Sequence, residues 1–240
     1  MSLPIAIPTK NRAGDLKSLQ FFPKATLFVE PKELNAYRAA HPESDLVDIG
    51  ANDRGIAFVR NFILNHYAPG RVLFADDDIT DLYVRGRGCK LKPLSAPEDL
   101  VRALNECLAR GYSQATISYG PSNWMFRGAH KTNTRAWCLW AIDCSLTARC
   151  DPGAVPFEDY DLTAQILRAG RKNISLFRYA FACVPMATNA GGLQSYDRLG
   201  MMAPAAQHLQ RKWGDLVRLV HNKTRNVTEV QFQWSKIAAP

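Results

Sequence analysis

The sequence lacks the patterns that mark membrane, secreted and zinc-binding proteins. No apolar run reaches the roughly 18 residues that a membrane-spanning helix needs. Residues 1–8 show neither the basic segment nor the long apolar segment of a signal peptide. The six cysteines include no C-x-x-C pair, which argues against a zinc ribbon or a thioredoxin-like site. We therefore expect a cytoplasmic protein with reduced thiols and no membrane association.

The composition is that of a globular domain with a positive net charge. Hydrophobic residues make up 47% and charged residues 22% of the chain, as in ordinary globular proteins. A length of 240 residues is enough for one sizeable α/β domain. The formal net charge of +8 favours a polyanionic partner, with nucleic acid as the first choice. We expect residues 1–240 to form one domain with two lobes, about 1–90 and about 91–240.

Three consecutive carboxylates, Asp76, Asp77 and Asp78, follow the apolar residues 72–75. The apolar run is typical of a strand buried on both faces. Alternation along an extended chain puts Asp76 and Asp78 on one side and Asp77 on the other. Two carboxylates on one side offer the hard oxygen ligands that Mg²⁺ and Mn²⁺ prefer. The alternative is a solvated acidic turn or a helix cap.

Expected strands and helices alternate before these aspartates. Strands are predicted at 4–8, 25–29 and 45–49, and helices at 31–40 and 56–67. This order is typical of the nucleotide-binding half of an α/β sheet, which binds ligands at the carboxyl ends of its strands. Polar residues at those ends are the candidates for nucleotide contacts. They are the loop 9–15, which lacks the glycine spacing of a phosphate loop, Glu30, which could equally cap a helix, and the helical pair Arg60 and Asn61.

The second half contains candidates for binding an acceptor. Strands are predicted at 81–84, 114–119, 135–142, 173–177, 179–184 and 227–234, with helices ending near residues 110, 170 and 214. The loop 120–131 mixes rings and cations, among them Trp124, Arg127 and Lys131, which suits stacking on sugars or bases. Aromatic residues in a sheet more often belong to the core. The basic tail adds Lys223 and Arg225 as candidates for contacts with a nucleic-acid backbone.

Two adjacent acids, Glu158 and Asp159, begin an expected helix that stops at Gly170. Acids at a helix N-terminus are favoured by the helix dipole, and this alone could explain them. The sharper hypothesis makes one of them a general base near the metal site. A group transfer requires one carboxylate set on the metal and another beside the acceptor.

The order of these motifs resembles that of the GT-A glycosyltransferases. The likeness rests on residues 7–12, the acid that ends the second strand, the D-x-D cluster and the later Glu-Asp pair. More narrowly, residues 27–31, 48–52 and 59–62, with Gly191-Gly192 followed by Arg198, look like the phage TET/JBP-associated glycosyltransferases. The resemblance implies an α/β, GT-A-like fold, in which a Rossmann-type nucleotide-binding half with a central mixed sheet carries a smaller acceptor lobe.

The resemblance also implies roles for single residues. The nucleotide-sugar donor, of the UDP type, would be held by Pro8, Thr9, Arg12 and Glu30, with Asp76 and Asp77. Mn²⁺ or Mg²⁺ would bind Asp76 and Asp78, and His221 or His208 would complete the metal shell. Asp159, or its neighbour Glu158, would be the acceptor-side base of an inverting enzyme, whereas a retaining enzyme needs no such base.

The activity implied by the resemblance is a metal-dependent transfer of a sugar to a hydroxyl group. The acceptor would be a 5-hydroxymethylpyrimidine base in DNA, and a phage protein of this kind would act in the host cytoplasm. One alternative is a transferase for a glycan, lipid or protein acceptor, which would show no salt-sensitive DNA binding. Another is a non-catalytic module that binds nucleotide or DNA, although such a module has no need of both acidic motifs. The sequence sets no oligomeric state.

Overall fold

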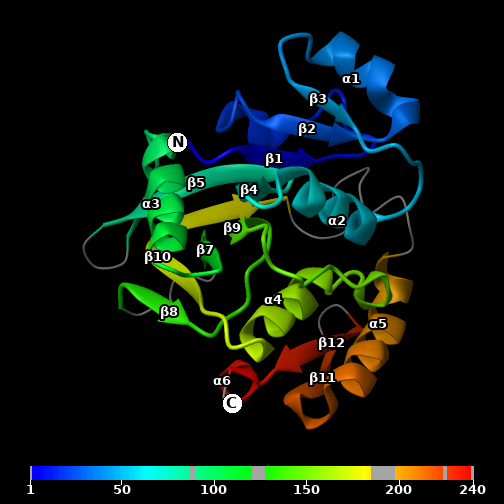
Figure 1. Cartoon of the computed structure of the whole chain (residues 1–240), viewed down its shortest axis with the longest axis vertical. Helices are drawn as coiled ribbons and strands as arrows, with labels where there is room; N and C mark the ends of the chain where they lie inside the picture. The colour runs from blue at the N-terminus through cyan, green and yellow to red at the C-terminus, as the bar shows by residue number, and fades with distance from the viewer. Residues whose placement is uncertain (1, 87–89, 121–127, 185–197, 224–225, 239–240) are drawn as a thin grey trace.

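A mixed sheet with helices on both faces forms the centre of the molecule (Figure 1). The computed structural model describes residues 2–86, 90–120, 128–184, 198–223 and 226–238. Within these ranges no helix is long and apolar enough to cross a membrane. The main sheet has ten strands: β1 Ile5–Pro8, β2 Thr26–Val29, β3 Leu46–Asp48, β4 Arg71–Ala75, β5 Ile79–Arg85, β6 Leu91–Pro93, β7 Gln114–Tyr119, β8 His130–Thr132, β9 Leu139–Asp143 and β10 Asn173–Cys183.

The strand order is β3-β2-β1-β4-β9-β7-β10-β5-β6, with β8 paired to β10. The first four strands are parallel, as the alternation of strands and helices predicts. Strand β9 runs antiparallel to both β4 and β7, so β7 points the same way as β4. Because β10 is parallel to β7, the strands β1, β2, β4, β7 and β10 all end at one edge of the sheet. That edge carries the aspartate cluster.

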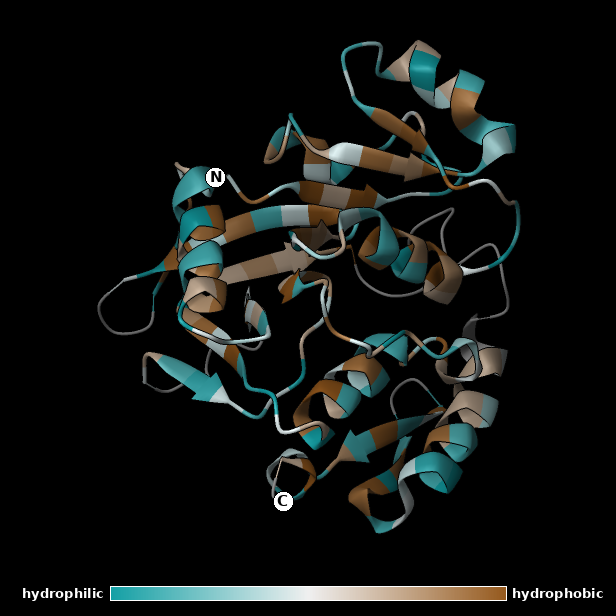
Figure 2. Ribbon diagram, viewed as in Figure 1, coloured by the Kyte–Doolittle hydropathy of each residue, from teal (hydrophilic) through white to brown (hydrophobic). Residues whose placement is uncertain are grey.

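Each face of the sheet is covered by its own layer of helices. One layer contains α1 (Leu34–Ala40) and α3 (Pro97–Ala109), with Leu100 and Leu104 fully buried. The other contains α2 (Ile56–Tyr67) and α4 (Glu158–Arg168), together with Trp140 stacked on Phe74 at 4.2 Å between ring centroids. Figure 2 shows the strands in the middle of the main sheet as mainly apolar. Burial of such side chains is the main source of stability for the sheet.

The C-terminal residues form a unit that packs on α4 (Figure 1). It contains α5 (Arg198–Trp213), the antiparallel hairpin of β11 (Val217–Asn222) and β12 (Val227–Phe232), and α6 (Trp234–Ile237). Asp161 of α4 is fully buried at this junction. Its carboxylate accepts hydrogen bonds from Trp213 Nε1 at 2.8 Å and Lys212 Nζ at 2.8 Å. One acid therefore joins α4 to the end of α5.

The structure corrects several of the predicted strands. The strand predicted at 135–142 begins only at Leu139, because Cys138 has a positive φ of 55°, which a strand does not adopt. The two strands predicted at 173–177 and 179–184 are one strand, β10, whose register against β7 shifts between Leu176 and Ala180. Strand β11 lacks a predicted counterpart because most of its residues are exposed and give no apolar alternation.

We predict that Asp161→Ala lowers the free energy of unfolding by about 3 kcal/mol, because it removes a fully buried carboxylate together with its hydrogen bonds from Trp213 and Lys212. Asp215→Ala, which removes an exposed acid of the same unit, should change it by less than about 0.5 kcal/mol. Urea unfolding followed by tryptophan fluorescence measures both values. Equal stabilities of the two variants would contradict the role given to Asp161.

Candidate active site

The aspartate turn follows β4 directly and is held in place by its backbone. Ser18, which is fully buried, donates from Oγ to the carbonyl of Asp76 at 2.5 Å and accepts from the amide of Ile79 at 3.0 Å. The amide of Asp76 donates to the carbonyl of Cys138 at 2.8 Å, and the carbonyl of Asp78 accepts from Val184 at 3.1 Å. The 3-10 helix at Lys17–Gln20, the residue before β9 and the residue after β10 thus fix the turn from several sides, and little backbone motion remains for the three carboxylates.

Asp77 points into the protein, away from its two neighbours. It forms a buried ion pair with Arg12 and accepts a hydrogen bond from Thr9 Oγ1 at 2.8 Å. The hydroxyl of Tyr37 lies 2.8 Å from the same Thr9 oxygen and accepts from the Arg12 amide at 3.0 Å. Burial raises the pKa of Asp77 to about 7, although the ion pair with Arg12 acts in the opposite direction. Thr9 and Arg12, predicted to contact nucleotide, therefore direct their side chains to Asp77.

Asp76 and Asp78 keep part of their carboxylates at the surface. Their side chains are 25% and 22% exposed, whereas that of Asp77 is 9% exposed. Asp76 Oδ1 accepts from Arg60 at 2.9 Å, and Asp78 Oδ2 lies 3.4 Å from Arg12. This is the alternation that the extended sequence predicts, with the central acid buried and the outer two accessible.

Arg60 joins the aspartate turn to the first turn of α4. Its guanidinium donates to Asp76 on one side and to Glu158 Oε1 at 2.6 Å on the other. Burial alone would lower the pKa of Arg60, but the carboxylates of Asp76 and Glu158 raise it overall. Both predicted acidic motifs are thus brought together by one buried cation.

Asp159 lies next to Glu158 and, unlike it, forms no ion pair with a described residue. Its Oδ1 accepts from the amide of Tyr160 at 2.8 Å, which is a local bond within the helix turn. Burial, and then the charge of Glu158, raise the pKa of Asp159 to about 7. A carboxylate with such a pKa is half protonated near neutral pH, which suits a group that takes up a proton.

The donor set at the turn fits a small divalent cation that keeps waters and substrate oxygens in its shell. Asp76 and Asp78 provide hard carboxylate oxygens from one side of the turn. Within the described ranges no group of three or more His, Cys, Asp or Glu residues could hold a metal, so a complete protein cage is not present there. Mg²⁺ and Mn²⁺ suit two carboxylates because a diphosphate can supply the further ligands.

A second polar cluster lies at the end of β2, beside the loop that follows β1. Glu30 is buried and accepts from Lys10 Nζ at 2.8 Å and from the amide of Asp53 at 3.0 Å. Glu33 accepts from the amide of Asn11 at 2.8 Å. In the described part of the chain Glu30 Oε2 and Glu33 Oε1 are buried without a hydrogen-bond partner, although Lys32 Nζ forms an ion pair with Glu30 Oε2 at 3.4 Å. A buried acceptor of this kind fits an N–H or O–H of a ligand.

The remaining predicted residues lie in several places. Asn61 exchanges hydrogen bonds with the backbone of Cys150 at 2.9 and 2.8 Å, so its amide is committed to the fold. His221 is exposed in β11, and the structure does not gather it with Asp76 and Asp78. His208 lies 3.0 Å from Asp151. Pro8 ends β1, and Lys131 and Lys223 are exposed. The predicted residues that fall outside the described ranges are Trp124, Arg127, Gly191, Gly192 and Arg225.

Several residues of the site have no counterpart among the predicted ones. Ser18, Tyr37, Lys10 and Asp53 hold the turn and the Glu30 cluster, yet none belongs to a recognisable motif. Their polar atoms meet partners that are distant in sequence. Of these four residues, Lys10 alone lies in a segment that the sequence marks as a candidate, the loop 9–15 after the first strand.

A basic hollow of about 310 Å³ lies at the opposite edge of the sheet, where β7 and β10 begin. Its walls are Arg110, Gly111, Tyr112, Gly170, Arg171 and Lys172. These residues follow the C-termini of α3 and α4, where cations complement the helix dipole. The hollow is therefore separate from the acidic site and is explained by helix termination.

Comparison with known proteins identifies one family and a set of similar structures. A family model described as TET-Associated Glycosyltransferase matches residues 3–192. No curated protein sequence matches the chain. Glucosyl-3-phosphoglycerate synthase from Mycobacterium tuberculosis, in complex with Mn²⁺, UDP and phosphoglyceric acid, has a TM-score of 0.58 and 11% identity, over 96% of this chain and 86% of that chain. S. aureus TarS 1–349, in complex with UDP-GlcNAc, has a TM-score of 0.56 and 15% identity, over 88% of this chain and 67% of that chain. At such identities the likeness shows the fold, which is the predicted GT-A-like arrangement.

We predict that Arg60→Met lowers the free energy of unfolding by about 3–5 kcal/mol, because it leaves the buried Glu158 without a counter-ion. The double variant Arg60→Met/Glu158→Gln should recover much of this loss, because the uncompensated charge is then gone. Chemical denaturation of the wild type, both variants and Glu158→Gln provides the four free energies of a double-mutant cycle. Independent, additive losses would show that Arg60 and Glu158 do not depend on each other.

Proposed function

Since this chain belongs to the TET-associated glycosyltransferase family, we propose that it transfers a sugar from a UDP-type nucleotide-sugar to the hydroxyl group of a 5-hydroxymethylpyrimidine base in DNA. The observation that carries this proposal is the bridge through Arg60. It holds a metal-type carboxylate, Asp76, and an acceptor-side acidic pair within one cluster. A transfer between two substrates requires both functions within reach of one reacting atom.

The donor side of the site would use the two clusters described above. Glu30, whose buried Oε2 has an ion pair with Lys32 and no hydrogen bond from the described residues, fits an N–H of a nucleobase or a hydroxyl of its ribose. Asp76 and Asp78 would hold Mn²⁺ or Mg²⁺ against the diphosphate, and the similar mycobacterial synthase was crystallised with Mn²⁺ and UDP. The bound cation supplies positive charge that stabilises the departing diphosphate. Arg60 and Arg12 would keep the two aspartates oriented while donor binds.

Asp159 is the better candidate for the base of an inverting transfer. Glu158 is 2% exposed and committed to Arg60, so its charge already has a structural partner. Among the described residues the Asp159 side chain accepts just the local hydrogen bond from the Tyr160 amide, and its pKa is raised to about 7. It would take the proton of the acceptor hydroxyl while that oxygen bonds to the sugar carbon and the bond to the diphosphate breaks.

DNA as acceptor is supported by the family description and by the formal net charge of +8. A basic protein gains affinity for DNA mainly through its phosphates, and that affinity falls with salt. A base inside a duplex would have to leave the stack to reach the site. An acceptor such as a glycan, lipid or protein is the main alternative, and it predicts no such salt dependence.

The test is a donor and acceptor screen with Mn²⁺, UDP-sugars and duplex DNA that either contains or lacks 5-hydroxymethylcytosine. Mass spectrometry of digested nucleosides should show a sugar mass only on the hydroxymethylated base. Asp78→Ala should reduce turnover about a hundredfold or more by removing a metal ligand. Asp81→Ala, which removes an exposed acid of β5, should leave it unchanged.

Each result of the screen has a definite meaning. UDP release without base modification would move the proposal to another acceptor. No turnover with any donor would favour a non-catalytic nucleotide- or DNA-binding module. Full activity of Asp78→Ala would remove the metal role from that residue.

The pKa of Asp159 near 7 gives a second prediction, on pH dependence. A general base must be ionised, so kcat/KM should rise with pH up to about 7 and then level off. Asp159→Asn should lose about a hundredfold or more in kcat, together with this inflection. A rate that is flat below pH 7, or an active Asn variant, would point to Glu158 or to a retaining reaction.

The pKa of Asp159 can also be tested without substrate, through the pH dependence of the free energy of unfolding. The pKa of Asp159 is raised in the folded state from 3.8 to about 7, so the folded state binds more protons in this interval. The free energy of unfolding of the wild type should therefore fall, relative to Asp159→Asn, as the pH rises from about 4 to about 7. Urea titrations at several pH values measure the difference.

A further inference from the structure

Arg135 lies in the segment that leads into β9, close to both sides of the site. Three residues further on, the carbonyl of Cys138 accepts from the amide of Asp76 in the aspartate turn. The guanidinium of Arg135 itself donates to the hydroxyl of Tyr160 at 2.5 Å. Tyr160 directly follows Asp159 on α4. Arg135 therefore contacts the neighbour of the candidate base and belongs to the segment whose Cys138 carbonyl holds the aspartate turn.

The guanidinium of Arg135 is held between two aromatic rings. Its central carbon lies 4.5 Å from the ring centroid of Trp137 and 5.5 Å from that of Tyr160. Trp137 is fixed in turn by Tyr119 and Phe181, at 5.0 and 5.5 Å between centroids. Cation–π contacts of this kind orient a guanidinium without using its N–H donors.

Most N–H donors of Arg135 have no hydrogen-bond partner among the described residues. A guanidinium has five N–H groups, and among the described residues the hydroxyl of Tyr160 is the one hydrogen-bond partner of Arg135. In that same part of the chain no carboxylate pairs with it, in contrast to Arg12 and Arg60, which each contact acids. The side chain is half-buried rather than enclosed. A fixed, uncompensated fork of donors beside the acceptor-side base fits an anion.

We propose that Arg135 binds a phosphate group of the acceptor, and that in DNA this is the phosphodiester next to the modified base, with Trp137 and Tyr160 as positioning residues. The proposal rests on the proposed function, because DNA is taken as the acceptor. A planar guanidinium matches two phosphate oxygens at once, and its prior fixation lowers the entropy lost on binding. Arg135 thereby sets which nucleotide enters the site, while Asp159 acts on that nucleotide's hydroxyl.

The test measures DNA affinity against salt concentration, by fluorescence anisotropy of a labelled duplex. Arg135→Ala should weaken DNA binding and raise the KM for DNA about ten- to hundredfold. It should also reduce the magnitude of the slope of log K against log salt by about 0.9, the value expected for one lost phosphate contact. Arg135→Lys should keep the slope and recover only part of the affinity, because it retains the charge but loses the fork. The KM for the donor should stay unchanged in both variants.

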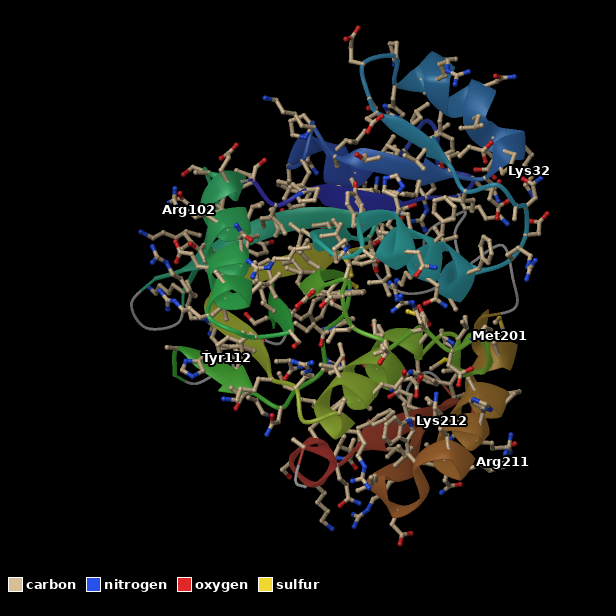
Figure 3. All side chains as sticks on the ribbon, in the orientation of Figure 1. Lys32, Arg102, Tyr112, Met201, Arg211 and Lys212 are labelled. Atoms are coloured by element: carbon tan, nitrogen blue, oxygen red, sulfur yellow. The ribbon has the colours of Figure 1, made fainter. Side chains whose placement is uncertain are left out.

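The matched control is Arg102→Ala, which removes the same charge from an exposed position on α3 (Figure 3). It should keep the wild-type slope and affinity. Tyr160→Phe removes one hydrogen bond from Arg135 and should raise the KM for DNA several-fold at constant slope. Thermal unfolding of each variant shows whether the fold is retained, and the conservative Lys and Phe variants keep the test decisive if Arg135→Ala unfolds.

A second arm separates the two sources of phosphate. The acceptor KM is compared for 5-hydroxymethyldeoxycytidine, its monophosphate and an oligonucleotide that contains it. An Arg135 effect on the oligonucleotide and not on the free nucleoside supports the proposal. If the monophosphate is used as well as the oligonucleotide and duplex affinity does not change in Arg135→Ala, the ligand is a small phosphorylated acceptor and the DNA assignment is overturned.

The outcomes also separate this proposal from the function on which it rests. A wild-type chain that binds DNA but modifies no base overturns the proposed activity, and the salt slope of Arg135→Ala still decides the role of Arg135. A wild-type chain that binds no DNA overturns both. If Arg135→Ala keeps the full slope, or raises the KM for the donor equally, Arg135 has a structural role only.

Discussion

The structure depends on the compensation of three adjacent carboxylates at the end of a buried strand. Left unpaired, Asp76, Asp77 and Asp78 would repel one another at a place where water is scarce. Two buried arginines resolve this conflict, Arg12 from the loop after β1 and Arg60 from α2. Because each arginine must reach its aspartate, the loop and the helix can pack on β4 in only one way. Arg60 extends the same constraint to α4 through Glu158.

The two arginines do not balance all of the negative charge, and the negative charge that is left shifts the pKa values in the site. Five carboxylates, those of residues 76–78, 158 and 159, meet two guanidiniums in this cluster. The excess of negative charge, added to burial, is why the pKa values of Asp77 and Asp159 rise to about 7. Under the proposed function, a divalent cation on Asp76 and Asp78 would remove part of that excess. Binding of the cation and ionisation of Asp159 would then favour each other.

The sequence predicts the parts that depend on local patterns and misses those that depend on distant partners. Apolar runs and turn residues predict β1 to β4 and the bounds of α2, and alternation predicts which aspartate is buried. Nothing local shows that Arg12 and Arg60 turn inward, because their partners lie 65 and 98 positions away. The sequence predicts a strand over 135–142, and the structure begins β9 only at Leu139. The positive φ of Cys138 breaks that strand and frees Arg135 to face Tyr160.

The first turn of α4 links the site to the C-terminal unit. Successive helical residues point about 100° apart, so four in a row face every direction around the axis. Glu158 meets Arg60, Tyr160 meets Arg135, and Asp161 meets Trp213. The family model matches residues 3–192, and the similar mycobacterial synthase covers 96% of the chain, so the likeness in fold extends into the C-terminal unit. The position of Asp159 thus depends on Arg60 on one side of α4 and on the C-terminal unit on the other. Under the proposed function, sequence changes in that unit would alter the acceptor side of the site through α4 and leave the aspartate turn in place.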